Sequence, residues 1–341
     1  MVDDSALIRR LVTGVLAEDP DIEVVGTAAN GRDAVAGVAE LRPDAVTLDI
    51  EMPVLDGLGA LREIRRLAPR LPVIMFSTLT ERGAAATLEA LSLGASDYVT
   101  KPSNTGSLAE GRASIRDQLV PRVKALAGVR RLAIAPVRPA ARRRTEAVDA
   151  VVIGCSTGGP DALSTVLAAL PRLPVPIAVV QHMPPVFTAM FAQRLDRDSP
   201  HEVVEATDGD AFLPGRVLLA PGDHHLRLEP SARGGVRARL DQGPQVNFCR
   251  PAVDVLFRSA ADLYGGRVLA VVLTGMGQDG LQGCRALRDR GAGVLVQDEA
   301  TSVVWGMPGA VAAAGLADEI VPLEALTDHI SAAVSLVAPV R

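Results

Sequence analysis

Short apolar runs alternate with helical hydrophobic patterns in two blocks of this 341-residue sequence. In the first block, 1–106, we predict strands at 22–27, 45–48, 73–76 and 98–100 and helices at 5–18, 30–41, 56–68 and 81–93. Strands that alternate with helices predict a parallel sheet with helices on both faces. This alternation constrains the fold more strongly than any other feature of the sequence.

The second block, 149–341, repeats the alternation. Its predicted strands are 150–153, 177–180, 217–220, 268–273 and 294–296, and its predicted helices are 160–170, 185–196, 251–264, 279–290 and 307–315. Glycine-rich turns and alternating leucines within 203–247 predict a β-hairpin insertion. The fold class is therefore α/β, with two doubly wound parallel-sheet domains.

The segment 107–148 separates the two blocks. It opens with a possible amphipathic helix up to residue 127 and then becomes rich in arginine and proline, with ten basic and three acidic residues in all. Its composition is typical of a solvated linker. A nucleic-acid or anionic-membrane contact would call for aromatic side chains and a folded frame, which this segment lacks.

The overall composition argues for a reducing compartment and against bulk nucleic-acid binding. The net charge of −5 is mild, and the three cysteines form neither a disulfide framework nor a zinc pattern. We expect a cytoplasmic protein, with no signal peptide and no membrane-spanning helix.

Several charged residues of the first block are expected to meet at one edge of its sheet. Asp49 and Lys101 directly follow predicted strands, whereas Asp3 and Asp4 directly precede a helix. Crowded carboxylates recruit a hard cation such as Mg²⁺, and one of them can attack a phosphoryl group whose charge the lysine then balances. Each aspartate taken alone would be read as a helix cap or turn residue, so the prediction depends on the set.

Residues 1–125 resemble the receiver domain of bacterial response regulators. The matching runs are Val2-Asp3-Asp4-Ser5, Leu48-Asp49-Ile50-Glu51-Met52-Pro53, Asp56-Gly57 and Thr100-Lys101-Pro102. The resemblance implies a flavodoxin-like domain in which a histidine kinase phosphorylates Asp49. It also implies that Asp3, Asp4 and Asp49 bind Mg²⁺ and that Lys101 contacts the phosphoryl group.

The same resemblance assigns the switch residues. Ser77 best matches the switch hydroxyl, with Thr78 a close alternative, and Tyr98 matches the aromatic residue that reorients on activation. Receivers also carry a central first strand before the acidic pair, whereas this sequence opens at Met1-Val2. Either the true start lies upstream or the receiver is impaired, because a missing central strand leaves backbone groups unpaired.

The second block contains the three side-chain types of a serine hydrolase. Ser156 lies in a glycine-rich turn between a predicted strand and helix, His182 directly follows a strand, and Asp279 lies beyond a third strand. A serine hydroxyl needs a histidine base, and a carboxylate can orient that base. The backbone N–H groups of Met276 and Gly277 could help to hold an oxyanion.

Two other readings of the serine turn are weaker. The α/β-hydrolase elbow also carries G-x-S-x-G, but its chain order of serine, acid and histidine would require His329, which lies in a predicted surface helix. A phosphate-binding loop would need the P-loop lysine or a further glycine, and both are missing. Among the remaining histidines, His224 and His225 are predicted to be turn residues.

Residues 149–338 closely resemble the catalytic domain of the chemotaxis protein-glutamate methylesterase family. The matching runs are 153–160, 181–184, 219–223, 253–257, 273–280 and 305–308. The resemblance implies a Rossmann-like α/β domain with Ser156 as nucleophile, His182 as base and Asp279 as orienting acid. By the same resemblance, the backbone of Met276 joins the oxyanion hole. Cys155 stands where the family often has alanine and is expected to be a small buried side chain.

Together the two resemblances imply a phosphorylation-regulated hydrolase. Its substrates would be glutamate γ-methyl esters, and certain glutamines, on the cytoplasmic domains of chemoreceptors. No cofactor is expected in the esterase site. The alternatives are a response regulator with another output, whose expected helix-turn-helix is missing, and a non-catalytic signalling adaptor, against which the intact serine, histidine and aspartate argue.

Overall fold

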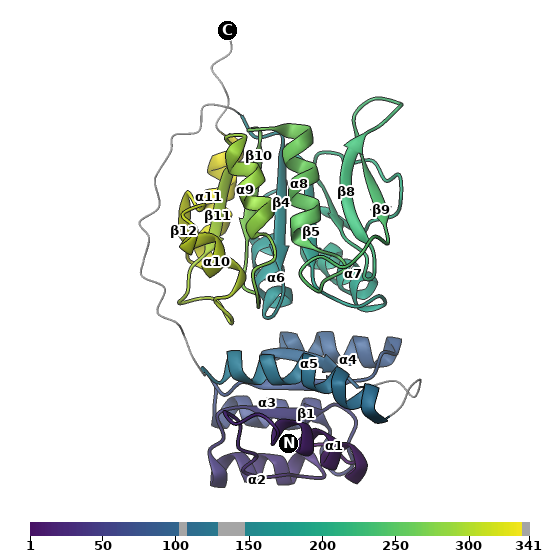
Figure 1. The fold of residues 1–341 in the computed structure, drawn as a ribbon, viewed down its shortest axis with the longest axis vertical. Helices are drawn as coiled ribbons and strands as arrows, with labels where there is room; N and C mark the ends of the chain where they lie inside the picture. Colours follow the sequence, from purple (N-terminus) through teal and green to yellow (C-terminus); the bar gives the residue numbers. More distant parts are fainter. Residues whose placement is uncertain (102–107, 129–146, 336–341) are drawn as a thin grey trace. The chain divides into compact units, whose positions relative to one another are not determined.

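The computed structural model describes residues 1–101, 108–128 and 147–335. The chain divides into two compact units, Met1–Leu132 and Ala133–Arg341 (Figure 1). Each unit contains a parallel sheet with helices packed on it, so the prediction of an α/β fold is confirmed. Among the described helices, none has the length and apolar character needed to cross a membrane.

The first unit is built on three parallel strands in the order β1-β2-β3. The strands are β1 (Val46–Asp49), β2 (Val73–Ser77) and β3 (Asp97–Thr100), and the helices are α1 (Ala6–Leu16), α2 (Gly31–Leu41), α3 (Gly57–Leu67), α4 (Glu81–Ser92) and α5 (Leu108–Leu126). Four helices begin where a side chain accepts a hydrogen bond from a backbone N–H of the first turn. These capping residues are Ser5, Asn30, Asp56 and Thr80.

Helices α1 and α5 bury one face of this sheet. Val12 and Val15 of α1 pack with Ile115 of α5 and with Phe76 of β2 in one apolar cluster. All four side chains are at most 1% exposed. Helix α5 therefore completes the core of the first unit.

The strand predicted at 22–27 does not form. Only Met1–Asp3 lie between this segment and β1, and Val2 alone bridges Ala28 on one side and Leu48 on the other. The prediction was wrong because a strand needs a partner along its length, and here pairing exists only at its end. A cavity of about 330 Å³ lies beside the unpaired stretch, lined among others by Val24 and Val46.

The second unit has a seven-stranded parallel sheet in the order β12-β11-β10-β4-β5-β7-β6. Its strands are β4 (Ala150–Cys155), β5 (Ile177–Gln181), β6 (Glu202–Glu205), β7 (Arg216–Leu219), β10 (Val268–Val272), β11 (Gly293–Gln297) and β12 (Glu319–Val321). The outermost strands, β6 and β12, were not predicted. Both have exposed or half-buried residues and lack the long apolar run of a central strand.

Helices cover both faces of this sheet (Figure 1). They are α6 (Gly159–Ala169), α7 (Phe187–Asp198), α8 (Val253–Tyr264), α9 (Leu281–Asp289), α10 (Met307–Ala313) and α11 (Leu326–Ser335). Helices α8, α9 and α10 share one apolar core with the sheet, and α6 packs against α7 and α11. The predicted hairpin forms from β8 (His225–Pro230) and β9 (Val236–Asp241) and packs against α8.

Candidate active site

Three neighbouring strands bring Ser156, His182 and Asp279 to one edge of the second sheet. Ser156 follows β4, His182 follows β5, and Asp279 lies in the loop between β10 and α9. Strand β4 lies between β10 and β5, and all three are parallel. The carboxyl ends of the strands therefore meet, at the place where open α/β sheets bind their ligands.

The register of β4 and β5 fixes the serine beside the histidine. Cys155 pairs with Gln181, and the backbone N–H of His182 donates to the carbonyl of Cys155 at 3.1 Å. Ser156 and His182 directly follow this pair of residues, so they leave the two strands side by side. Cys155 itself is fully buried, and burial raises the pKa of its thiol.

The turn that carries Ser156 is tightly packed. The Ser156 N–H donates to the Thr274 carbonyl at 3.0 Å, and the Gly159 N–H donates to the Ser156 carbonyl at 2.7 Å. Gly158 has φ +74°, a left-handed conformation that glycine adopts without strain. A Cβ added at Gly275 would lie 2.8 Å from the Ser156 Cβ, so this loop can approach the serine only without a side chain.

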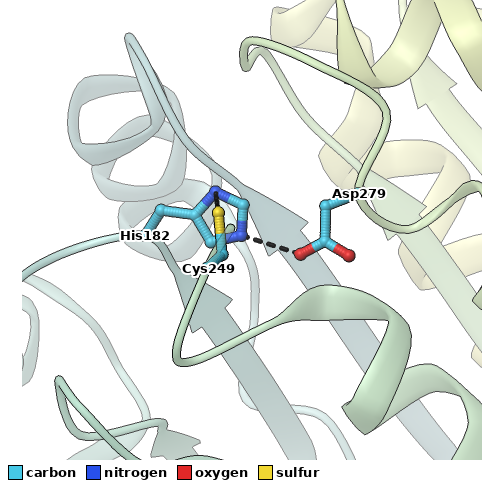
Figure 2. Close-up of side chains that lie close together, drawn as sticks. All are labelled: His182, Cys249 and Asp279. Atoms are coloured by element: carbon cyan, nitrogen blue, oxygen red, sulfur yellow. Dashed lines mark hydrogen bonds and ion pairs between the residues drawn. The ribbon is translucent and has the colours of Figure 1, made fainter. Parts of the chain in front are cut away.

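The carboxylate of Asp279 holds the imidazole of His182. Nε2 of His182 lies 2.9 Å from Oδ2 of Asp279 (Figure 2). Backbone N–H groups of Val253 and Asp254, at the start of α8, also donate to this carboxylate at 2.6 and 3.0 Å. Burial alone would raise the pKa of Asp279, but His182 and these N–H groups outweigh it and hold the pKa below its usual value.

Because a carboxylate only accepts hydrogen bonds, Nε2 of His182 must carry the proton that faces Asp279. The lone pair of the neutral ring is then on Nδ1, which is the nitrogen left to accept a proton from Ser156. Among the described residues, no hydrogen bond joins the Ser156 hydroxyl to His182. Such contacts are often longer before substrate binds.

Two residues of the site were not found from the sequence. The side-chain amide of Asn247 donates to Asp279 at 2.9 Å. Sγ of Cys249 lies 3.6 Å from Nδ1 of His182, as Figure 2 shows. Burial disfavours charge on His182, whereas a negative charge on Cys249 and the carboxylate of Asp279 favour it, and together these two raise the pKa of His182. Both missed residues lie in the loop between the hairpin and α8, where no periodic pattern marks a site.

The loop after β10 presents a free backbone donor. The N–H groups of Gly306 and Met307 donate to the Gly275 carbonyl at 3.1 and 2.8 Å and fix this loop. A Cβ added at Gly306 would lie 2.5 Å from that carbonyl oxygen. Within the described part of the chain, the N–H of Met276 makes no hydrogen bond, so it can donate to an oxyanion.

Each of the other four histidines has a partner outside the Ser156 turn. Nε2 of His201 accepts from the Leu173 N–H, His224 contacts the Gly222 carbonyl, His225 bridges Pro244 and Ala252, and His329 pairs with Glu319. Their contacts are structural, so the geometry favours His182 as the base.

In the first unit, Lys101 ties two buried carboxylates together. Its ammonium lies 2.9 Å from Oδ2 of Asp3 and 2.8 Å from Oδ2 of Asp49. Oxygens of Asp3, Asp4 and Asp49 all lie within 4.8 Å of one another. Apart from the lysine contacts, both Oδ2 atoms are buried without a hydrogen-bond partner among the described residues. A donor set made only of oxygens fits a hard divalent cation.

The expected switch residues Ser77 and Tyr98 lie on neighbouring strands, Ser77 as the last residue of β2 and Tyr98 as the second residue of β3. The Ser77 hydroxyl is buried, accepts from Thr87 at 2.7 Å and lies 3.2 Å from the Gly83 carbonyl. Thr78, its alternative, is exposed and bonds to Thr80. Tyr98 is buried, and burial raises the pKa of its hydroxyl. None of the hydrogen bonds of Ser77 reaches Asp49.

Replacing Asp49 by asparagine is expected to stabilise the first unit above about pH 6 by about 1–3 kcal/mol. Burial raises the pKa of Asp49 from 3.8 to about 6, although Lys101 acts in the opposite direction. The stability that goes with the protonated form is present below about pH 4 and is lost as pH rises through about 6. Asparagine does not ionise, so the Asp49→Asn variant does not lose this stability as pH rises.

Hydrogen exchange of β1 and β2 amides at about pH 5 and about pH 8 measures the difference. The matched control is Asp44→Asn, because Asp44 is exposed. Equal protection of wild type and Asp49→Asn at the higher pH would contradict the prediction.

The comparisons with known proteins agree with both units. Residues 151–330 match the family model for CheB methylesterase, and residues 1–111 match the response regulator receiver domain. A protein-glutamate methylesterase/protein-glutamine glutaminase of Nocardioides sp. is 56% identical over 335 residues, which cover 95% of this chain and 91% of the relative. Another, from Trichodesmium erythraeum, is 49% identical and covers 97% of each chain.

A solved structure gives the same result for the second unit. The crystal structure of the Thermotoga maritima CheB methylesterase catalytic domain is 42% identical, with a TM-score of 0.53. It covers 56% of this chain and 100% of that domain. The chain therefore belongs to the CheB methylesterase family, and it joins a methylesterase domain to a response regulator receiver domain.

Proposed function

We propose that this protein hydrolyses γ-methyl esters of glutamate side chains on chemoreceptors, and thereby takes part in chemotactic adaptation. The observation that carries the proposal is the placement of Ser156 beside the His182–Asp279 pair, at the carboxyl ends of β4, β5 and β10. The relatives at 56% and 49% identity are protein-glutamate methylesterases, and the match covers 91% and 97% of their sequences.

In this mechanism, Ser156 attacks the ester carbonyl and Nδ1 of His182 takes its proton. Asp279 stabilises the imidazolium that forms. The N–H of Met276 donates to the oxyanion of the tetrahedral intermediate. His182 then protonates the departing methoxide, and water resolves the acyl-enzyme with His182 again as base.

The same chemistry serves the side-chain amide of glutamine. His182 protonates the departing amide nitrogen, which leaves as ammonia, and the acyl-enzyme is the same glutamyl ester. The related enzymes are also protein-glutamine glutaminases. We therefore include deamidation of certain receptor glutamines in the proposal.

The first unit would regulate the second through phosphorylation of Asp49 by a histidine kinase. Asp3, Asp4 and Asp49 would hold Mg²⁺, which neutralises charge on the phosphoryl group when bound. Lys101 already contacts both buried carboxylates and would pair with the phosphorylated product. Ser77 and Tyr98 remain the proposed switch residues.

The proposed division of the chain is a receiver domain at 1–106, its last helix and a basic linker at 107–148, and the catalytic domain at 149–341. The substrate would be the cytoplasmic part of a chemoreceptor, which places the enzyme in the cytoplasm. Neither nucleic acid nor membrane insertion has a part in this function.

Methanol release from membranes that contain methylated receptors tests the function and its regulation together. We expect wild-type protein to release methanol faster when Mg²⁺ and a small-molecule phosphodonor are both present. Asp49→Asn should release methanol only at the rate seen without the donor, because asparagine cannot be phosphorylated.

If wild-type protein releases methanol at the same rate with and without the phosphodonor, the regulatory part of the proposal is wrong. A complete lack of release from folded wild-type protein would remove the substrate assignment. The fluorescence of the single tryptophan, Trp305, reports whether the second unit is folded.

A further inference from the structure

A thiol lies directly against the nitrogen that the proposed mechanism needs as its base. Sγ of Cys249 is 3.6 Å from Nδ1 of His182, and the opposite nitrogen is 2.9 Å from Asp279 (Figure 2). The methylesterase mechanism gives Cys249 no role. Ligand atoms of these three residues lie within 4.8 Å of one another.

The separation of sulfur and nitrogen fits two ligands of one tetrahedral zinc ion. Zinc lies about 2.3 Å from a cysteine sulfur and about 2.0–2.1 Å from a histidine nitrogen. At a tetrahedral angle, these bond lengths place sulfur and nitrogen about 3.5–3.6 Å apart. The observed 3.6 Å meets this requirement with no movement of either residue.

Asp279 is placed to support such a site from behind the histidine. Its oxygens already accept from the N–H groups of Val253, Asp254 and Gly280 and from the Asn247 amide, so it has no free position for a metal. It instead holds the proton on Nε2 and leaves the Nδ1 lone pair facing the thiol. A carboxylate behind a metal-binding histidine is the usual arrangement at zinc sites.

A rigid turn holds the thiol in position. The backbone groups of Val246 and Cys249 bond to each other in both directions, at 3.1 and 2.9 Å. Between them, Asn247 and Phe248 have φ values of 52° and 62°. The Asn247 side chain ties this turn to Asp279 and Asp254. Phe248 is 95% exposed, so the turn lies at the surface where an ion can arrive.

We propose that Sγ of Cys249 and Nδ1 of His182 form a zinc-binding site, and that zinc bound there inhibits the hydrolase. Cys249 binds as a thiolate, so its proton is released to solvent when the ion binds. Water fills the remaining positions. The bound ion occupies the lone pair that must accept the Ser156 proton. The inhibition rests on the proposed function, whereas the binding does not.

The nitrogen and sulfur donors separate this site from the acidic cluster of the first unit. Mg²⁺ prefers oxygen ligands, whereas zinc favours imidazole and thiolate. Mg²⁺ can therefore be kept in excess while zinc is varied, which leaves the receiver cluster occupied by Mg²⁺ during the measurement.

The test uses the full-length, reduced protein after removal of metals. Co²⁺ replaces zinc as a spectroscopic probe, because a cobalt–thiolate bond gives a near-ultraviolet charge-transfer band. We expect this band in wild-type protein, its loss when zinc is added, and its absence in Cys249→Ser. The matched control is Cys155→Ala, which removes a thiol beside Ser156 that does not contact His182, and which should keep the band.

Methanol release at increasing free zinc is measured on the same proteins. The zinc concentration for half inhibition should rise at least about tenfold in Cys249→Ser and stay near the wild-type value in Cys155→Ala. A charge-transfer band that persists in Cys249→Ser would overturn the site. Equal inhibition of wild type and Cys249→Ser would also overturn it, because the zinc would then act elsewhere.

The experiment tests zinc binding and the proposed hydrolase function separately. A Cys249-dependent band without inhibition would overturn the inhibitory role while leaving the ligands in place. If folded wild-type protein released no methanol, the proposed function would fail, and the cobalt band would still test the zinc site.

Discussion

Substitution of Ser156 by alanine should lower kcat for methanol release by about 10⁴–10⁶-fold. Ser156 directly follows β4, and the pairing of Cys155 with Gln181 sets it level with His182. Alanine removes the nucleophile without adding volume to a tightly packed turn. The oxyanion donor and the bound substrate would remain, so a small residual acceleration over water is expected.

The matched control is Ser164→Ala, on the helix that follows the same turn. The Ser164 hydroxyl donates to the Pro160 carbonyl of its own helix at 2.7 Å. This variant should keep activity within about a factor of two, since a half-buried helix hydroxyl contributes little. Comparable rates for Ser156→Ala and wild type would exclude Ser156 as the nucleophile.

Substitution of Asp279 by asparagine should lower kcat by about 10⁴-fold. The aspartate oxygens face only donors: Nε2 of His182, the Asn247 amide and three backbone N–H groups. An asparagine must turn its NH₂ group toward one of these donors. Either the imidazole takes the wrong tautomer or a buried N–H loses its partner, which costs about 1–3 kcal/mol.

Asp254→Asn serves as the control for this experiment. Asp254 is equally buried and lies in the first turn of α8, but its carboxylate accepts from the Gly283 N–H and the Asn247 amide instead of from His182. Burial raises the pKa of Asp254, so a neutral side chain is tolerated there more easily. We expect a loss of at most about tenfold, and Trp305 fluorescence checks folding of both variants. Equal losses in the two variants would contradict the orienting role of Asp279.

The sequence alone predicted the strand ends that carry the chemistry. The apolar runs before Ser156 and His182 are continuous because both strands are buried on two faces, and such runs are readable without a structure. Parallel strands end at one edge, so residues that follow them are expected to meet. The prediction for Asp49 and Lys101 depended on the same reasoning, and their ion pair bears it out.

Tertiary structure decided what depends on partners distant in the sequence. The segment 22–27 has a strand-like pattern, but backbone partners reach only its end, and strand formation requires partners along the segment that composition does not reveal. Likewise, Asn247 and Cys249 reach Asp279 and His182 from an irregular loop, whose path depends on the packing of the hairpin against α8. The sequence determined which side chains could perform the chemistry, whereas the packing determined which nitrogen of His182 faces the carboxylate and which faces the thiol.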